Sequence, residues 1–308
     1  MNKALLFSGQ GSQYIGMMSD FFQNNSKAQS MINMADEILG YKLSQIMFEG
    51  PIEKLTETRY TQPALFLHSA VLFDLLKNKI TFTGVAGHSV GEYAALYSSG
   101  VLTFEDALRL VSARGNLMFE IGQEFPGTMF AIVGMDDEKL NETVNRLNQN
   151  DEKLEKIVVA ANFNSPGQIV ISGSRDYLRE IVGEFKSNGA KIVKELVVSG
   201  AFHSPLMQPV KIELDKLIES TQFNDANVSI YMNVSAKAAT KSNEIKELLK
   251  EQVISSVYWT QILQNMKNDG ISEFTELGPN SVLQGLVKRT LTEVIINGAD
   301  KIADLEKF

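Results

Sequence analysis

The chain has 308 residues, of which 44% are hydrophobic and 21% are charged, so it can bury a substantial core and is expected to fold as one large domain or two. Its 37 acidic and 29 basic side chains give a formal net charge of −8, which argues against binding to a nucleic-acid backbone or an anionic membrane surface. The absence of cysteine excludes disulfides, a thiolate nucleophile and cysteine-based zinc sites, and we predict no metal site.

The first predicted element is a buried strand over residues 4–7, which ends in a glycine-rich turn at 9–11. This apolar run is too short for a signal peptide, and no later run approaches the roughly 18 apolar residues of a membrane-spanning helix, so we expect a cytoplasmic protein. A helix is predicted over 62–77, and a small-residue strand over 84–87 leads through Ser89 into a further helix. Strands that alternate with helices predict an α/β fold whose parallel sheet is covered on both faces.

Between residues 127 and 199 the pattern changes to short elements in the order β-α-β-β-α-β. The predicted strands cover 128–133, 156–163, 168–172 and 191–198, and the predicted helices cover 136–147 and 174–187. An Asn-Ser-Pro-Gly turn separates the two middle strands. This order is that of a ferredoxin-like unit, so we predict a core formed by 1–126 and 200–308 with a ferredoxin-like subdomain inserted at 127–199.

The main sheet is predicted to resume after the insertion. Strands are expected at 228–233 and 271–276, helices at 244–253 and 260–268, and a last helix from Ser281 that Asn280 caps. No internal repeat or low-complexity linker interrupts this pattern.

The segment Gly87-His88-Ser89-Val90-Gly91 matches the G-x-S-x-G pattern of a nucleophile elbow, in which small neighbours let a strained turn lift a serine hydroxyl above the sheet. The pentapeptide alone also fits an ordinary glycine-rich turn. However, a predicted strand precedes it, a helix follows it, and the residue after Ser89 offers a backbone N–H at the helix end, where negative charge is stabilised. This context favours Ser89 as a nucleophile.

A serine nucleophile needs a base, and the sequence offers only His68, His88 and His203. His88 adjoins Ser89 in an extended segment, so its side chain points to the opposite face. His68 lies in an apolar helical stripe, which favours a role in the core. His203 follows the last strand of the insertion, in a loop that can reach the carboxyl edge of the sheet. We predict His203 as the base, with a surface histidine as the alternative, and no acid stands out by spacing as its orienting partner.

A charged residue falls within the apolar arc of a helix predicted over 104–119. Arg114 lies in this arc, whereas Arg109 lies on the opposite, polar side. An arginine among core-facing residues needs a partner, because an unpaired buried charge is costly. The partner is either an acid of the same protein or a ligand carboxylate, which a guanidinium binds with two parallel hydrogen bonds.

Seven short segments, spread in order over nearly the whole chain, form a specific combination. They are Gly9-Gln10-Gly11-Ser12-Gln13, Thr61-Gln62-Pro63-Ala64, Gly87-His88-Ser89-Val90-Gly91-Glu92, Arg114-Gly115, Asn162-Phe163-Asn164-Ser165-Pro166-Gly167-Gln168, Ala201-Phe202-His203-Ser204 and Glu276-Leu277-Gly278-Pro279. In this combination the chain resembles the malonyl-CoA:acyl-carrier-protein transacylases, a family that includes the acyltransferase domains of fatty-acid and polyketide synthases. The resemblance implies an α/β-hydrolase-like core with a parallel sheet and an inserted ferredoxin-like subdomain.

The resemblance also implies catalytic, oxyanion-binding and substrate-binding roles for residues of this sequence. The catalytic residues are Ser89, His203 and Gln252, whose carbonyl orients His203, the oxyanion hole is formed by the backbone N–H groups of Gln10 and Val90, and the substrate-binding residues are Arg114, Met118, Gln62 and Asn162. Arg114 is expected to bind the malonyl carboxylate and Met118 to line the acyl pocket. Gln252 is placed only by its distance from Trp259, and Asn280 stands where the family has the last glycine of Gly-Pro-Gly.

The implied activity is ping-pong transfer of a malonyl group from malonyl-CoA to the phosphopantetheine thiol of acyl carrier protein, which supplies extender units for fatty-acid synthesis. The expected partners are malonyl-CoA and acyl carrier protein, and no cofactor is expected because the CoA thioester is a substrate. A carrier protein is commonly acidic, so we expect a local basic patch, although the sequence does not show which lysines form it. Three alternatives stay open: a trans-acting acyltransferase of a polyketide synthase, a serine hydrolase or thioesterase, and a non-catalytic carrier-binding scaffold.

Overall fold

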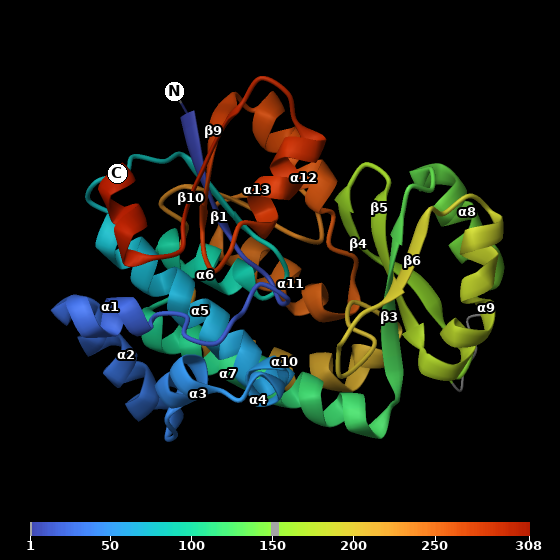
Figure 1. The fold of residues 1–308 in the computed structure, drawn as a ribbon, viewed down its shortest axis with the longest axis horizontal. Helices are drawn as coiled ribbons and strands as arrows, with labels where there is room; N and C mark the ends of the chain where they lie inside the picture. The colour runs from blue at the N-terminus through green and yellow to red at the C-terminus, as the bar shows by residue number, and fades with distance from the viewer. Residues whose placement is uncertain (1, 149–153) are drawn as a thin grey trace.

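The computed structural model describes residues 2–148 and 154–308 of the chain. The protein is a mixed α/β structure with two separate sheets, a larger core sheet and a small sheet beside it (Figure 1). Within the described ranges, no helix combines the length and the apolar character needed to cross a membrane.

The core sheet has six strands in the order β10-β9-β1-β2-β7-β8. The strands are β1 Asn2–Phe7, β2 Gly84–Gly87, β7 Ser229–Tyr231, β8 Ala238–Ala239, β9 Ile271–Leu277 and β10 Ile295–Ala299. Neighbouring strands are parallel from β10 through β7, and only β8 runs antiparallel to its neighbour. The carboxyl ends of β1, β2 and β7 therefore lie side by side at one edge of the sheet.

Helices cover both faces of the core sheet. They are α1 Ser19–Asn24, α2 Ser26–Leu39, α3 Leu43–Glu49, α4 Ile52–Thr56, α5 Thr58–Leu76, α6 Gly91–Ser98, α7 Phe104–Glu124, α10 Gln208–Ser220, α11 Ser242–Glu251, α12 Trp259–Asn268 and α13 Val282–Thr290, with the 3-10 turns η1 Pro205–Met207, η2 Gln252–Ile254 and η3 Ile302–Lys307. Side chains of β1 alternate between two cores: Leu5 and Phe7 pack with α2, α5, α6 and α7, whereas Ala4 and Leu6 pack with α12 and α13. This alternation explains why β1 is apolar on both faces.

The small sheet has four antiparallel strands in the order β4-β5-β3-β6. Its strands are β3 Gly127–Val133, β4 Val158–Ser165, β5 Gln168–Ser174 and β6 Ile192–Glu195, and its helices are α8 Asp137–Leu147 and α9 Arg175–Ser187. The two helices lie together on the outer side of this sheet (Figure 1) and share an apolar core with it that includes Leu140, Leu178 and Phe185. The small sheet thus has a core of its own.

The small sheet is joined to the rest of the protein along β4. The Val257 N–H donates to the Ala161 carbonyl at 2.8 Å, and the Phe163 N–H donates to the Val257 carbonyl at 2.9 Å. The Thr260 hydroxyl adds a hydrogen bond of 3.0 Å to the Phe163 carbonyl. These contacts place the end of β4, with Asn162 and Asn164, near the carboxyl edge of the core sheet.

The predicted strands and helices are present in the structure, with shifted ends. The strand predicted at 191–198 ends at Glu195, and the helix predicted at 244–253 ends at Glu251 and continues as the 3-10 turn η2. The predicted cap of the last helix was wrong, because Ser281 occupies the N-cap position of α13. Asn280 instead has a left-handed φ of 64°, and its side chain donates to the Ser12 carbonyl at 2.7 Å.

Gly91, the first residue of α6, offers a test of how closely this helix approaches the core sheet. A Cβ at this position would lie 2.2 Å from the Phe7 carbonyl oxygen of β1. Gly91→Ala is therefore expected to lower the free energy of unfolding by about 1–3 kcal/mol or more, since α6 must move away from β1. The measurement is the thermal unfolding midpoint.

Gly183 in α9 is the matched control, because a Cβ there would have no neighbour within 4 Å. Gly183→Ala is expected to raise the free energy of unfolding by up to about 1 kcal/mol, since alanine restricts the unfolded chain and favours helix. Equal shifts of the midpoint in the two variants would contradict the close approach of α6 to β1.

Candidate active site

Ser89 lies in a sharp turn between β2 and α6. Its φ of 52° is left-handed, a strained value for a residue other than glycine. A Cβ at Gly87 would lie 1.9 Å from the carbonyl of Gly91, so the two ends of the turn are in direct contact. Only glycine fits at both positions, which is the physical reason for the G-x-S-x-G spacing.

Asn233, which follows β7, holds this turn from the neighbouring strand. Its Oδ1 accepts the Ser89 N–H at 2.8 Å, and its Nδ2 donates to the Gly87 carbonyl at 2.7 Å. Its own backbone N–H donates to Glu92 Oε1 at 2.6 Å. Because Asn233 is fully buried, these hydrogen bonds fix the conformation of the turn.

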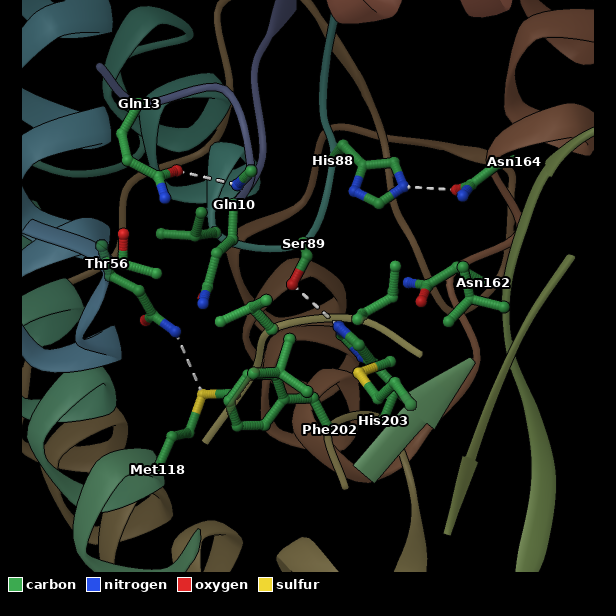
Figure 2. Close-up of a pocket in the computed structure, with 18 residues that line it drawn as sticks. Gln10, Gln13, Thr56, His88, Ser89, Met118, Asn162, Asn164, Phe202 and His203 are labelled. Atoms are coloured by element: carbon green, nitrogen blue, oxygen red, sulfur yellow. Dashed lines mark hydrogen bonds between the residues drawn. The ribbon is translucent and has the colours of Figure 1, made fainter. Parts of the chain in front are cut away.

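Ser89 and His203 form a pair in which the histidine can act as a base (Figure 2). The Ser89 Oγ lies 2.8 Å from His203 Nε2, and His203 Nδ1 lies 3.0 Å from the carbonyl oxygens of both Gln252 and Ser255. Carbonyl oxygens only accept hydrogen bonds, so the network assigns the proton to Nδ1 and leaves Nε2 free to accept the serine proton. Burial, with the nearby Arg114 charge, holds the pKa of His203 well below its usual range, which keeps the ring neutral. The alternative of a surface histidine was wrong, since His203 is buried.

The other two histidines lie as predicted from the sequence, His68 in the core and His88 directed away from the Ser89 hydroxyl. His68 is fully buried in α5, with Nε2 at 3.1 Å from Asp300 Oδ1, which confirms a role in the core. His88 faces Asn164 of the small sheet, with 2.8 Å between Nε2 and Oδ1, and its ring meets the indole of Trp259 edge-on. Figure 2 shows its ring directed away from the Ser89 hydroxyl.

Arg114 is fully buried in α7, directly behind the nucleophile. Its Nη2 donates to Gln252 Oε1 at 3.0 Å and to Ser89 Oγ at 3.2 Å. Its Nε and Nη1 have no hydrogen-bond partner, and among the described residues no acid forms an ion pair with it. The exposed Arg109, by contrast, pairs with Glu105 at 2.7 Å. Arg114 thus contacts the serine through Nη2 and keeps two nitrogens without a partner.

Gln252, in the 3-10 turn η2, contacts four groups of the site. Its backbone carbonyl lies next to His203 Nδ1, and its Oε1 accepts from Arg114. Its Nε2 donates to the Ser89 carbonyl at 2.9 Å and to the carboxylate of Glu92. Both the backbone and the side chain of Gln252 therefore take part in the arrangement.

A cavity of about 350 Å³ opens beside Ser89 and His203 (Figure 2). Besides Ser89 and His203, five more of the residues that the resemblance selects line it, namely Gln10, Gln62, Val90, Met118 and Asn162. Arg114 and Gln252 are not among the lining residues. Both are buried and contact Ser89, Arg114 through Nη2 at 3.2 Å from Oγ and Gln252 through Nε2 at 2.9 Å from the carbonyl oxygen.

Two backbone N–H groups at the cavity are available to a ligand. In residues 2–148 and 154–308, neither the N–H of Gln10 nor that of Val90 donates to another protein group. Gln10 follows β1, and Val90 is the N-cap of α6, where the helix dipole favours negative charge. Such donors suit an oxyanion.

Three contributors to this site were not predicted from the sequence. Glu92 stands in an otherwise apolar stretch of α6 in which nearly every residue is buried, and an acid in such a stretch is a signal that could have been used. Asn233 follows the carboxyl end of a buried strand, a second usable signal. Ser255 contributes only a backbone carbonyl, for which the sequence carries no signal.

This geometry suits acyl transfer through a serine ester. A family model described as an acyl transferase domain matches residues 4–306, so the chain belongs to the acyl transferase family. A malonyl CoA-acyl carrier protein transacylase of Staphylococcus aureus is 38% identical over 307 residues, covering 98% of this chain and 97% of the relative.

Solved structures of the same kind superpose over the whole chain. An acyl carrier protein S-malonyltransferase from Vibrio cholerae has a TM-score of 0.94 at 35% identity, covering 100% of this chain and 99% of that one. A malonyl-transacylase structure, solved in complex with a type II polyketide-synthase acyl-carrier protein, also has a TM-score of 0.94, at 33% identity over 100% of this chain and 98% of that one.

Replacing Asn233 by alanine tests whether the hydrogen bonds of this residue hold the nucleophile. Asn233→Ala leaves the buried Ser89 N–H and Gly87 carbonyl without partners, at a cost of about 1–3 kcal/mol for each group. We expect a lower unfolding midpoint together with slower labelling of Ser89 by a fluorophosphonate probe.

Asn265→Ala is the control, since Asn265 also donates to a backbone carbonyl, that of Ala236 at 2.9 Å, but lies outside the site. It should lower stability without changing the labelling rate. Equal labelling rates in both variants and the wild type would show that Asn233 does not hold the nucleophile.

Proposed function

We propose that this chain transfers a malonyl group from malonyl-CoA to the phosphopantetheine thiol of an acyl carrier protein, through a malonyl ester of Ser89. The observation that carries this proposal is the position of the Ser89 oxygen, 2.8 Å from His203 Nε2 and 3.2 Å from Arg114 Nη2. The histidine serves the ester chemistry, and the arginine with its unpartnered nitrogens suits an acyl group that carries a carboxylate.

In the first half-reaction, Ser89 Oγ attacks the thioester carbonyl while His203 Nε2 accepts the serine proton. The negative charge on the carbonyl oxygen is stabilised by the N–H groups of Gln10 and Val90. When the intermediate collapses, the C–S bond breaks and His203 returns the proton to the departing CoA sulfur. The carbonyl of Gln252 keeps the Nδ1 proton in place throughout, so Nε2 remains the reactive nitrogen.

Arg114 selects the acyl group in this proposal. A malonyl group attached to Ser89 extends its carboxylate into the surroundings of the serine oxygen, where the guanidinium holds unused donors. Gln62, Asn162 and Met118 complete the pocket, in which Gln62 Nε2 lies 3.2 Å from Met118 Sδ.

In the second half-reaction, the phosphopantetheine thiol enters the cavity and His203 takes its proton. The thiolate attacks the malonyl ester, and the serine oxygen regains the proton as malonyl leaves on the carrier. Apolar walls, including Met129 and Phe202, disfavour water as the competing acceptor. We propose that the malonyl group is used in fatty-acid synthesis. A trans-acting role in polyketide synthesis is the second candidate function, because one structural neighbour is a malonyl-transacylase in complex with a polyketide-synthase acyl-carrier protein.

We extend the proposal to the architecture and the conditions of the reaction. The separate sheets and cores support an α/β-hydrolase-like core formed by 1–126 and 200–308 and a ferredoxin-like subdomain at 127–199.

No cofactor is needed in the proposed reaction, because exchange of an acyl group between a thioester and an ester is redox-neutral and His203 accepts and returns each proton. We propose that the protein acts in the cytoplasm.

Mass spectrometry after mixing with malonyl-CoA tests the function. The wild type should carry a stable malonyl adduct on Ser89 that a carrier thiol removes, and Ser89→Ala should carry none at an unchanged unfolding midpoint. Rapid release of free malonate without the carrier would indicate a hydrolase. Failure of the wild type to form an adduct would indicate a scaffold, and either result would overturn the proposal.

A further inference from the structure

Glu92 is a fully buried carboxyl group for which the mechanism above has no use. Its Oε1 accepts the Asn233 N–H at 2.6 Å, and its Oε2 accepts from Gln252 Nε2. It lies close enough to Arg114 for their charges to interact, without a direct ion pair. Burial raises the pKa of Glu92 to about 7, so the fold bears the cost of keeping this acid next to the nucleophile.

The hydrogen bonds around Gln252 allow its amide only one orientation. Nε2 faces two acceptors, the carboxylate of Glu92 and the Ser89 carbonyl, while Oε1 faces the donor Nη2 of Arg114. A flipped amide would place oxygen against both acceptors and NH₂ against the guanidinium. The orientation therefore determines how Gln252 supports the serine backbone and the arginine.

We propose that Glu92 is a positioning residue that fixes the side-chain amide of Gln252, and through it the backbone of Ser89 and the guanidinium of Arg114, for acylation. This inference rests on the proposed function, because it concerns the rate at which Ser89 is acylated. Glu92 touches neither the substrate nor the reacting atoms, so its effect passes through Gln252.

Glutamine at position 92 has nearly the same shape as glutamate but reverses one hydrogen bond. In Glu92→Gln, the side-chain oxygen would still accept the Asn233 N–H. The new NH₂ group would then face Gln252 Nε2. Two N–H donors, the new NH₂ group and Gln252 Nε2, would then face each other with no acceptor between them. The Gln252 amide must either lose this contact or rotate, and rotation removes the donor from the Ser89 carbonyl.

A purely electrostatic role of Glu92 would change the rate in the opposite direction. Removing a negative charge near Ser89 and Arg114 favours both the oxyanion and a malonyl carboxylate, so it would leave acylation unchanged or speed it. Acetyl-CoA carries no acyl carboxylate and reports on the positioning of Ser89 without the attraction between malonyl and Arg114. Slower acylation by acetyl-CoA is therefore specific to loss of positioning.

The experiment measures single-turnover acylation of Ser89 by acetyl-CoA in wild type and Glu92→Gln. We expect the variant to be slower by roughly ten- to hundredfold, as for other small displacements of reacting groups. Asp36→Asn is the matched control, because Asp36 is also a buried acid that accepts a backbone N–H, that of Ser44 at 3.0 Å, but lies in α2 away from the site. It should keep the wild-type rate. A Glu92→Gln rate equal to or above wild type overturns the inference.

The pH profile of the same reaction adds a second readout. Besides Gln252 and Asn233, two charged or titratable groups lie near Glu92: Arg114 of α7, and Tyr93, the next residue of α6. Burial raises the pKa of Tyr93 far above neutrality. Arg114 stays charged and His203 stays neutral near pH 7, so Glu92 is the group of this cluster whose charge changes there. Acylation should accelerate as the pH rises through about 7 in the wild type.

Glu92→Gln should lack this rise. An inflection of the wild-type rate that Glu92→Gln retains unchanged overturns the inference. Adduct formation by the wild type with malonyl-CoA tests the proposed function separately. A normal wild-type adduct together with an unaffected Glu92→Gln variant would remove only the role of Glu92.

Discussion

The burial of one cation, the guanidinium of Arg114, constrains the arrangement of the whole site. Moving such a charge out of water costs several kcal/mol unless hydrogen bonds and opposite charge compensate for it. The protein supplies only part of that compensation, through Gln252 Oε1 and the Ser89 hydroxyl, with Glu92 as a nearby opposite charge. Nε and Nη1 have no partner, while Nη2 lies 3.2 Å from the oxygen of the reacting serine. In the proposed function a substrate carboxylate supplies the missing opposite charge, so affinity and selectivity for the acyl group would have the same origin.

The topology explains how residues from distant parts of the chain meet at this cation. Gln10, Ser89 and Asn233 each follow one of three neighbouring parallel strands, β1, β2 and β7, whose carboxyl ends lie side by side. Ligands of open α/β sheets bind at this edge. The loop with His203 and the turn with Gln252 approach from the same side, and β4 of the small sheet closes the cavity.

The residues that could be predicted from the sequence are those with a local signal. Ser89 has the glycine spacing of its turn, Arg114 has the phase of its helix, and His203 was left by elimination among three histidines. Glu92 and Asn233 also have a local signal, a polar residue within or directly after a buried apolar element, but their partners lie 141 and more residues away, so the sequence does not show what they bind. Whole elements were missed as well. Helices α1, α3 and α4 have only 6, 7 and 5 residues, too few to show a helical period, whereas α2 and α10, with 14 and 13 residues, and strand β10 were not predicted although they are long enough to be recognised.

The most direct test of the role of Arg114 is the ratio of kcat/KM for malonyl-CoA over acetyl-CoA in wild type and Arg114→Ala. Loss of a buried partner for the malonyl carboxylate costs on the order of 3–5 kcal/mol, which lowers malonyl transfer by roughly two to three and a half decades. The acetyl group has no carboxylate, so acetyl transfer should fall much less. The ratio of malonyl to acetyl kcat/KM should therefore decrease strongly in Arg114→Ala. An unchanged ratio would contradict the account, because malonyl selectivity would then come from elsewhere in the pocket.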